Sequence, residues 1–357
     1  MLRGHDSVFD RFRRTIRAGR LASTFLFVGP PGIGKRSFAL QLAQGLLCER
    51  RPDEALDPCG ACPTCAQVLA GTHPDIHVVR KPADKNTIPI KLLIGEDDTR
   101  NREGLCYDIS LKPFSGRRKF GIIDDADILG AGQGESANCL LKTLEEPPPK
   151  SLLILIGTSE QRQLPTIRSR CQVVRFSPLP ESDVADLLLS TGACSDEGLA
   201  RKAAALSGGS LAKAIQWCDE AFLEFRAALF ENLSQRDYDL PPLAKTVTSF
   251  VESAGKEGAE KRARMREVLT MGLGFYEQLI AALSSNALSS SPRDEALQKA
   301  VATTVRWWPG DAEAATYCVE ICLDALAHVD ANANLTALAE WWLDELSQTA
   351  RSGVMRV

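Results

Sequence analysis

The sequence has few features of a membrane protein, of a nucleic-acid-binding protein or of a hydrolase with a catalytic triad. None of the apolar runs in its 357 residues approaches the roughly 20 residues that a membrane-spanning helix needs. Residues 1–6 lack an apolar stretch of the signal-peptide type, so we expect a cytoplasmic protein with no membrane contact. The formal net charge of −4 excludes an overall positive field for nucleic acid. We also find no nucleophile–histidine–acid constellation.

One hydroxyl is missing from an otherwise complete motif. Residues 29–35, Gly-Pro-Pro-Gly-Ile-Gly-Lys, match a phosphate loop, but Arg36 follows Lys35 where the pattern has Ser or Thr. That hydroxyl normally holds Mg²⁺ beside the β- and γ-phosphates, and a guanidinium has no lone pair to replace it. An apolar run at 25–28 and helical spacing over 38–47 predict the strand–loop–helix context of a phosphate loop. The sequence therefore predicts an ATPase-like site that lacks one group needed for hydrolysis.

The pattern of apolar residues predicts an α/β domain followed by helices. Runs at 76–79, 120–124 and 152–157 predict further strands, and their alternation with helices favours a parallel sheet covered on both faces. No strong strand pattern follows residue 178. We predict an α/β domain over 1–177, a small helical domain over 178–220 and an all-helical domain over 221–357. A stripe of apolar residues places the last helix at 335–346.

Acidic, hydroxyl and guanidinium side chains follow the predicted strands. Asp124 and Asp125 end the third strand and resemble a Walker B segment, in which the first acid holds Mg²⁺ and a Glu polarises water. Asp125 stands in place of that Glu and is one methylene shorter. The alternative is a cluster of acids that begins a helix. Thr158 could sense a γ-phosphate, and Arg170 could act as an arginine finger or be an ordinary solvated residue.

Four cysteines are spaced as metal ligands. Cys48, Cys59, Cys62 and Cys65 follow the pattern C-x10-C-x2-C-x2-C. Four thiolates fill a tetrahedral Zn²⁺ shell with no open position, which is typical of a structural site. The alternative is a redox pair with two buried cysteines. The histidine of His73-Pro74-Asp75 is interpreted as part of a structural turn.

Taken together, these features resemble bacterial clamp-loader subunits of the AAA+ class. The resemblance rests on the cysteine insertion after the phosphate-loop helix, the stretch 140–147 and Ser169-Arg170-Cys171. It is strong over the first 220 or so residues and weaker beyond. It implies an AAA+ domain with a zinc module at 48–65, a lid and a C-terminal collar. The nucleotide-binding residues that it implies, in working or vestigial form, are Gly29, Gly32, Gly34, Lys35, Arg36, Asp124, Asp125 and Thr158.

Two types of subunit within this family remain possible. The gamma/tau type hydrolyses ATP, whereas a stator type keeps the fold and uses ATP poorly or not at all. Arg36, Asp125 and the replacement of a sensor arginine by Ala212 favour the stator. The resemblance then implies that Arg170 completes the ATP site of a neighbouring subunit. Whether the chain binds ATP and Mg²⁺ itself is left open.

The implied partners are the gamma/tau and delta clamp-loader subunits. The sliding clamp and primed DNA would be reached through the complex, as part of the DNA polymerase III holoenzyme in DNA replication. The alternative is a zinc-dependent nucleic-acid-binding protein without loader partners. Asp53, Glu54 and Asp57 lie in the cysteine segment and suit nucleic acid poorly.

Overall fold

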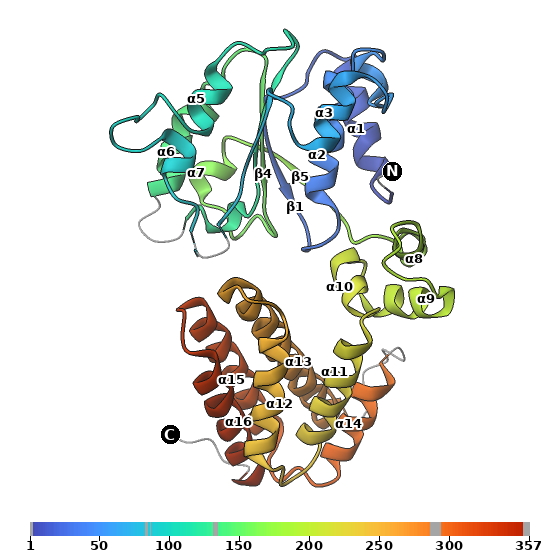
Figure 1. The fold of residues 1–357 in the computed structure, drawn as a ribbon. Coiled ribbons are helices and arrows are strands. Elements are labelled where there is room, and N and C mark those ends of the chain that lie inside the picture. The colour runs from blue at the N-terminus through green and yellow to red at the C-terminus, as the bar shows by residue number, and fades with distance from the viewer. Residues whose placement is uncertain (1–2, 83–84, 86, 131–134, 286–293, 353–357) are drawn as a thin grey trace. The chain divides into compact units, whose positions relative to one another are not determined.

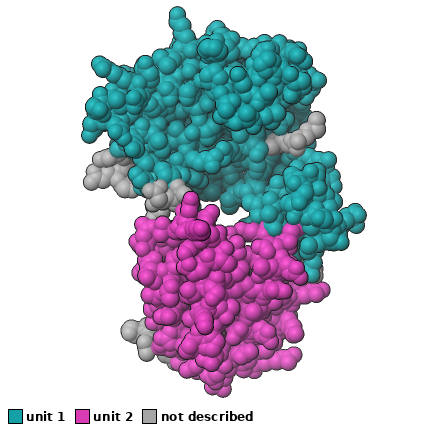
Figure 2. All heavy atoms as spheres, viewed as in Figure 1, with its two compact units in different colours: residues 1–215 teal, residues 216–357 magenta. Residues whose placement is uncertain are grey.

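The computed structural model describes residues 3–82, 85, 87–130, 135–285 and 294–352. The chain divides into two compact units, residues 1–215 and 216–357, which are coloured separately in Figure 2. None of the helices within the described ranges is long and apolar enough to cross a membrane.

A five-stranded parallel sheet forms the centre of the first unit (Figure 1). Its order is β2-β3-β4-β1-β5, and each neighbouring pair is parallel. The strands are β1 (Thr24–Val28), β2 (Ile76–Val79), β3 (Lys119–Ile123), β4 (Ser151–Ile156) and β5 (Gln172–Arg175). The four predicted strands are confirmed. The fifth was not predicted, because it is a short edge strand whose ends, Gln172 and Arg175, are exposed.

Alternate residues of β1 pack on opposite faces of the sheet, as the two-residue period of a strand requires. Phe27 lies 5.8 Å from Phe38, between ring centroids, in a cluster of aromatic rings from β1, α1 (Asp6–Arg17) and α2 (Lys35–Leu47). Leu26 and Val28 belong to a second apolar cluster with residues of α4 (Lys91–Ile94), α5 (Leu105–Ser110) and α6 (Glu135–Glu145). Both faces are therefore covered, which confirms the predicted fold class.

Helical segments connect the strands and complete the first unit. Their bounds are η1 (Asp53–Ala55), α3 (Pro63–Ala70), α4 (Lys91–Ile94), α5 (Leu105–Ser110), η2 (Ala126–Ile128), α6 (Glu135–Glu145), α7 (Pro165–Arg168), α8 (Glu181–Ser190), α9 (Glu197–Leu206) and α10 (Leu211–Gln216). Helices α8 to α10 follow the sheet in the chain, where the sequence predicts a lid.

The described part of the second unit is helical throughout. Its helices are α11 (Glu220–Leu233), α12 (Leu240–Glu252), α13 (Gly258–Ser285), α14 (Glu295–Val305), α15 (Ala312–Asp330) and α16 (Leu335–Ser352). The predicted last helix is confirmed and extends further than expected. Its apolar stripe is buried, and the indole N–H of Trp342 donates to Cys322 Sγ at 3.3 Å. Asn334 begins the helix, because its side-chain oxygen accepts from the N–H groups of Thr336 and Ala337.

Candidate functional sites

The phosphate loop occupies the turn between β1 and α2. Gly32 and Gly34 have φ angles of 75° and 93°, which only glycine adopts without strain. A Cβ at Gly32 would also lie 2.3 Å from Ser210 Oγ, so the start of α10 leaves no room for a side chain. The predicted strand–loop–helix context is present.

The carbonyl groups of this loop are all engaged by the chain itself. Each carbonyl from residue 29 to residue 33 accepts a hydrogen bond from a donor in the same unit. The donors are Lys35 Nζ to Gly29 and Pro30 (2.6 Å each), Ser210 Oγ to Pro31 (3.0 Å), the Leu211 N–H to Gly32 (3.0 Å) and His5 Nε2 to Ile33 (2.7 Å). The loop conformation is therefore held by α1, α2 and α10 together.

The loop borders a cleft of about 430 Å³. The three acids after β3, the residues after β4 and the start of α10 line its other sides. Thr158, which the sequence suggested as a sensor of a γ-phosphate, lies in this cleft, and its hydroxyl donates to Asp127 Oδ2 at 2.6 Å. The Thr158 N–H and the Gln163 amide donate to the same carboxylate. Sequence reasoning assigned no role to Asp127, although a third acid after the strand was a visible signal.

Arg36 and Asp124 face each other in the cleft. Arg36 Nε lies 3.9 Å from Asp124 Oδ2, and this Nε is buried with no hydrogen-bond partner among the described residues. Burial lowers the pKa of Lys35, although the charges of Asp127 and Asp124 oppose that shift. Burial, followed by the charge of Asp124, raises the pKa of Asp125. Asp125 also has a left-handed φ of 60°.

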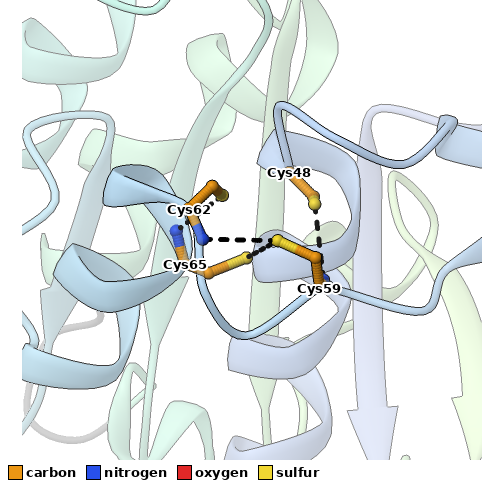
Figure 3. Close-up of side chains that lie close together, drawn as sticks. All are labelled: Cys48, Cys59, Cys62 and Cys65. Carbon is orange, nitrogen blue, oxygen red and sulfur yellow. Dashed lines mark hydrogen bonds between the residues drawn. The ribbon is translucent and has the colours of Figure 1, made fainter.

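The four predicted metal ligands come together in one place (Figure 3). Cys48 caps the end of α2, Cys59 lies in the following loop, and Cys62 and Cys65 belong to the start of α3. Their sulfur atoms all lie within 4.8 Å of one another. A tetrahedral shell with Zn–S bonds of about 2.3 Å requires sulfur atoms about 3.8 Å apart. This cluster can therefore hold a metal ion, and its all-sulfur donor set fits Zn²⁺.

Backbone N–H groups support thiolate formation in the cluster. The N–H of Cys59 donates to Cys48 Sγ at 3.5 Å, and the N–H of Cys62 donates to Cys59 Sγ at 3.3 Å. Burial works against ionisation of Cys48, but such N–H donors prevail and lower its pKa. Burial raises the pKa of Cys65 to about 12. The Cys65 carbonyl is tied to α2 by the side chain of Gln44 at 3.0 Å.

Arg170 lies at the other end of the sheet from the phosphate loop. Thr24, the first residue of β1, donates its hydroxyl to the Arg170 carbonyl at 2.7 Å, whereas the loop follows the last residue of β1. The Arg170 guanidinium donates to Glu145 (Nε to Oε1, 2.8 Å) and to the Thr166 carbonyl (2.9 Å). Its side chain remains 31% exposed.

Comparison with known proteins relates this chain to DNA polymerase III subunits. A family model described as DNA polymerase III, delta subunit matches residues 4–180. The DNA polymerase III subunit delta' of Pseudomonas aeruginosa is 36% identical over 234 residues, which is 64% of this chain and 66% of that protein. The delta' subunit of Bacillus subtilis is 33% identical over 226 residues, 62% of this chain and 63% of that protein.

The gamma/tau subunit of Mycobacterium tuberculosis (strain H37Rv) is 32% identical over 196 residues, 55% of this chain and 31% of that protein. The matched part thus spans less than two thirds of each of these relatives. The chain belongs to the DNA polymerase III clamp-loader family. The delta' matches support a subunit of the delta-prime type, which corresponds to the stator type that the sequence favours.

Ala212 of this clamp-loader subunit lies in the cleft at the start of α10. In our interpretation of the sequence, Ala212 replaces an arginine that would touch a γ-phosphate. Its methyl group carries no charge and donates no hydrogen bond. Among the residues that line the cleft, Lys35 and Arg36 therefore carry the positive side-chain charge.

Proposed function

We propose that this clamp-loader subunit is a stator that supplies Arg170 to the ATP site of a neighbouring gamma/tau-type subunit. The observation that carries the proposal is the position of Arg170 relative to the chain's own loop. The five residues of β1 separate the two, about 16 Å at 3.3 Å per residue. Its guanidinium is therefore remote from its own cleft and can complete only a site on another subunit.

The surroundings of Arg170 support a role as a finger. Glu145, Thr166 and Ser169 orient a guanidinium that is still partly exposed. An oriented guanidinium stabilises the charge that develops on a transferred phosphoryl group and costs little reorganisation. The Glu145 carboxylate would keep the side chain in place until a phosphate of the neighbouring subunit competes for it.

The test is ATP turnover by a loader assembled with its gamma/tau and delta subunits, the sliding clamp and primed DNA. Arg170→Ala should lower turnover by as much as ~10³-fold, the effect of a strong finger. Arg168→Ala is the matched control, because Arg168 is an exposed arginine at the end of the adjacent α7. Turnover by Arg170→Ala equal to that of the control would remove the finger role.

Two further elements complete the proposal. Zn²⁺ at the cysteine cluster would staple the segment 48–65 to α2, since a closed sulfur shell has no open position for catalysis. The helices of the second unit would join a collar that holds the loader subunits together. The clamp and primed DNA would be contacted through the complex.

A gamma/tau-type motor is the second candidate, because Lys35 and Asp124 are both present in the cleft. It predicts ATP hydrolysis by the isolated chain that Lys35→Ala abolishes. Steady-state hydrolysis by the purified chain separates the two candidates. Absence of turnover supports the stator, whereas turnover that depends on Lys35 supports the motor.

A further inference from the structure

The ligand set for Mg²⁺ is broken in this cleft. Mg²⁺ demands oxygen ligands in near-octahedral geometry. In phosphate-loop ATPases, the protein provides a hydroxyl after the loop lysine and a carboxylate after the acidic strand. Here Arg36 replaces the hydroxyl, and its Nε lies 3.9 Å from the carboxylate of Asp124. A dication would meet a fixed positive charge there, so the residues present do not fit Mg²⁺.

The loop nevertheless keeps the construction of an anion site. Its carbonyl groups from residue 29 to residue 33 are all engaged, as described above. By contrast, in the part of the chain that the structure describes, the N–H groups of Gly32, Ile33 and Gly34 donate no hydrogen bond to another protein group. They stand at the N-terminus of the 13-residue helix α2, whose dipole favours negative charge. Free donors and engaged acceptors together favour a phosphate.

Two of the three acids that line the cleft face other groups of the chain. Asp124 faces Arg36, and Asp127 accepts hydrogen bonds from Thr158 and Gln163. Lys35 is held by the Gly29 and Pro30 carbonyls, which a flexible side chain can exchange for phosphate oxygens. The buried, unpartnered Nε of Arg36 is a further donor that a phosphate oxygen would satisfy.

We propose that this cleft binds a nucleoside polyphosphate without Mg²⁺, and that the Arg36 guanidinium takes the place of the metal between Asp124 and the phosphates. A second cavity of about 520 Å³ shares Gly34, Ser37 and Leu211 with the cleft. Leu40 and Leu179 give it an apolar wall, which suits a base rather than inorganic phosphate alone. This inference is independent of the finger role of Arg170.

The test is calorimetric titration of ADP into the full-length chain, once with EDTA and once with Mg²⁺. The wild-type chain should bind ADP equally well in both buffers. Arg36→Thr restores the missing hydroxyl, so its affinity should fall about tenfold or more in EDTA and recover with Mg²⁺. Arg36→Lys keeps the cation and should keep binding in EDTA. Lys35→Ala should bind weakly in both buffers.

Two outcomes would overturn the proposal. One is the absence of ADP binding by the wild-type chain in both buffers, and the other is wild-type binding that requires Mg²⁺. Circular dichroism of each variant separates lost binding from lost folding, and Arg36→Lys keeps the test open if Arg36→Thr does not fold. Neither outcome alters the expected effect of Arg170→Ala on the assembled loader, so the two proposals fail separately.

Discussion

The Asp75 carboxylate is completely buried just before β2, where an unpaired charge would be costly. Its oxygens accept from the N–H groups of Phe114 and Ser115 at 2.7 and 2.8 Å, and Lys119 Nζ lies 3.8 Å away. Burial alone would raise the pKa of Asp75, but the N–H groups of Ser115 and Phe114 prevail and lower it. The residue holds the loop before β3 against the start of β2, in keeping with the structural interpretation of His73-Pro74-Asp75.

Asp75→Asn should lower the free energy of unfolding at pH 7 by about 2 kcal/mol, because buried donors lose a charged acceptor. The folded-state pKa lies below its ordinary value of 3.8, so the contribution is complete above that pH and is lost as the pH falls through the folded value. Urea unfolding between pH 7 and pH 2.5 measures both effects. The exposed acid Asp97, changed to Asn, is the control. A pH profile of Asp75→Asn identical to that of the wild type would contradict this account.

At the scale of elements, two helices of the second unit approach closely at a glycine. A Cβ at Gly272 in α13 would lie 2.6 Å from Trp342 Cζ2 in α16. Trp342 is fully buried and cannot move aside without breaking its bond to Cys322. Gly274, two residues further along α13, has open space around the corresponding position. In α13, close packing therefore requires a glycine at position 272 but not at position 274.

Gly272→Ala should destabilise the chain by about 1–3 kcal/mol, as overpacking of a core does. Gly274→Ala should instead be neutral or stabilising by about 0.5–1 kcal/mol, since alanine is the better helix former. Thermal unfolding of the two variants under identical conditions measures the difference. Equal unfolding temperatures for the two variants would show that α16 moves to accommodate the added methyl group. The close approach of α13 and α16 would then not require a glycine.

The buried cluster of the cysteine segment consists of its own cysteines, so we expect the segment to depend on the zinc ion that we propose. The purified chain should contain about one equivalent of zinc, as expected for a single closed shell. Cys62→Ser should lose that zinc and lower the unfolding temperature, whereas Cys218→Ser, remote in sequence, should retain it. Elemental analysis and calorimetry are the measurements. A metal-free chain that unfolds like the zinc-loaded one would argue for a different role of the cluster.

At the scale of the whole molecule, the chain consists of two units with separate interiors. The helices of the second unit bury one large cluster of apolar side chains, which includes Phe275, Tyr276 and Trp342. The indole of Trp217 stacks on Arg226 (4.5 Å), which also pairs with Asp294, so even the first residues of this unit have partners within it. A single contiguous core of this kind is what an independent domain requires.

A fragment of residues 217–357 should therefore fold alone. We expect a helical circular dichroism spectrum and a single cooperative thermal transition. The matched control is the same fragment with Gly272→Ala, which should unfold at a lower temperature. A fragment without helical signal would show that the first unit is needed for the second to fold.

The sequence predicted most strands and the cysteine cluster, but it did not predict the edge strand β5. The strands at 25–28, 120–124 and 152–157 were found because buried parallel strands are continuous apolar runs. The edge strand at 76–79 is only partly buried and was found from Ile76, Val78 and Val79. The edge strand β5 was missed, because only Val173 and Val174 lie between its exposed ends. The convergence of the four cysteines followed from their spacing and is confirmed. The divisions of the chain at residues 177 and 220 stay predictions.

Local spacing alone determined the phosphate loop, the cysteine cluster and the helical second half, since each depends on residues close together in the chain. Only the tertiary structure decided which groups meet in the cleft. Ser210 contacts the loop across 179 positions, and the pairing of Arg36 with Asp124 joins α2 to the end of β3. Such contacts depend on the order of strands in the sheet. Strand order follows from packing of the whole domain, because no local pattern encodes which strands become neighbours.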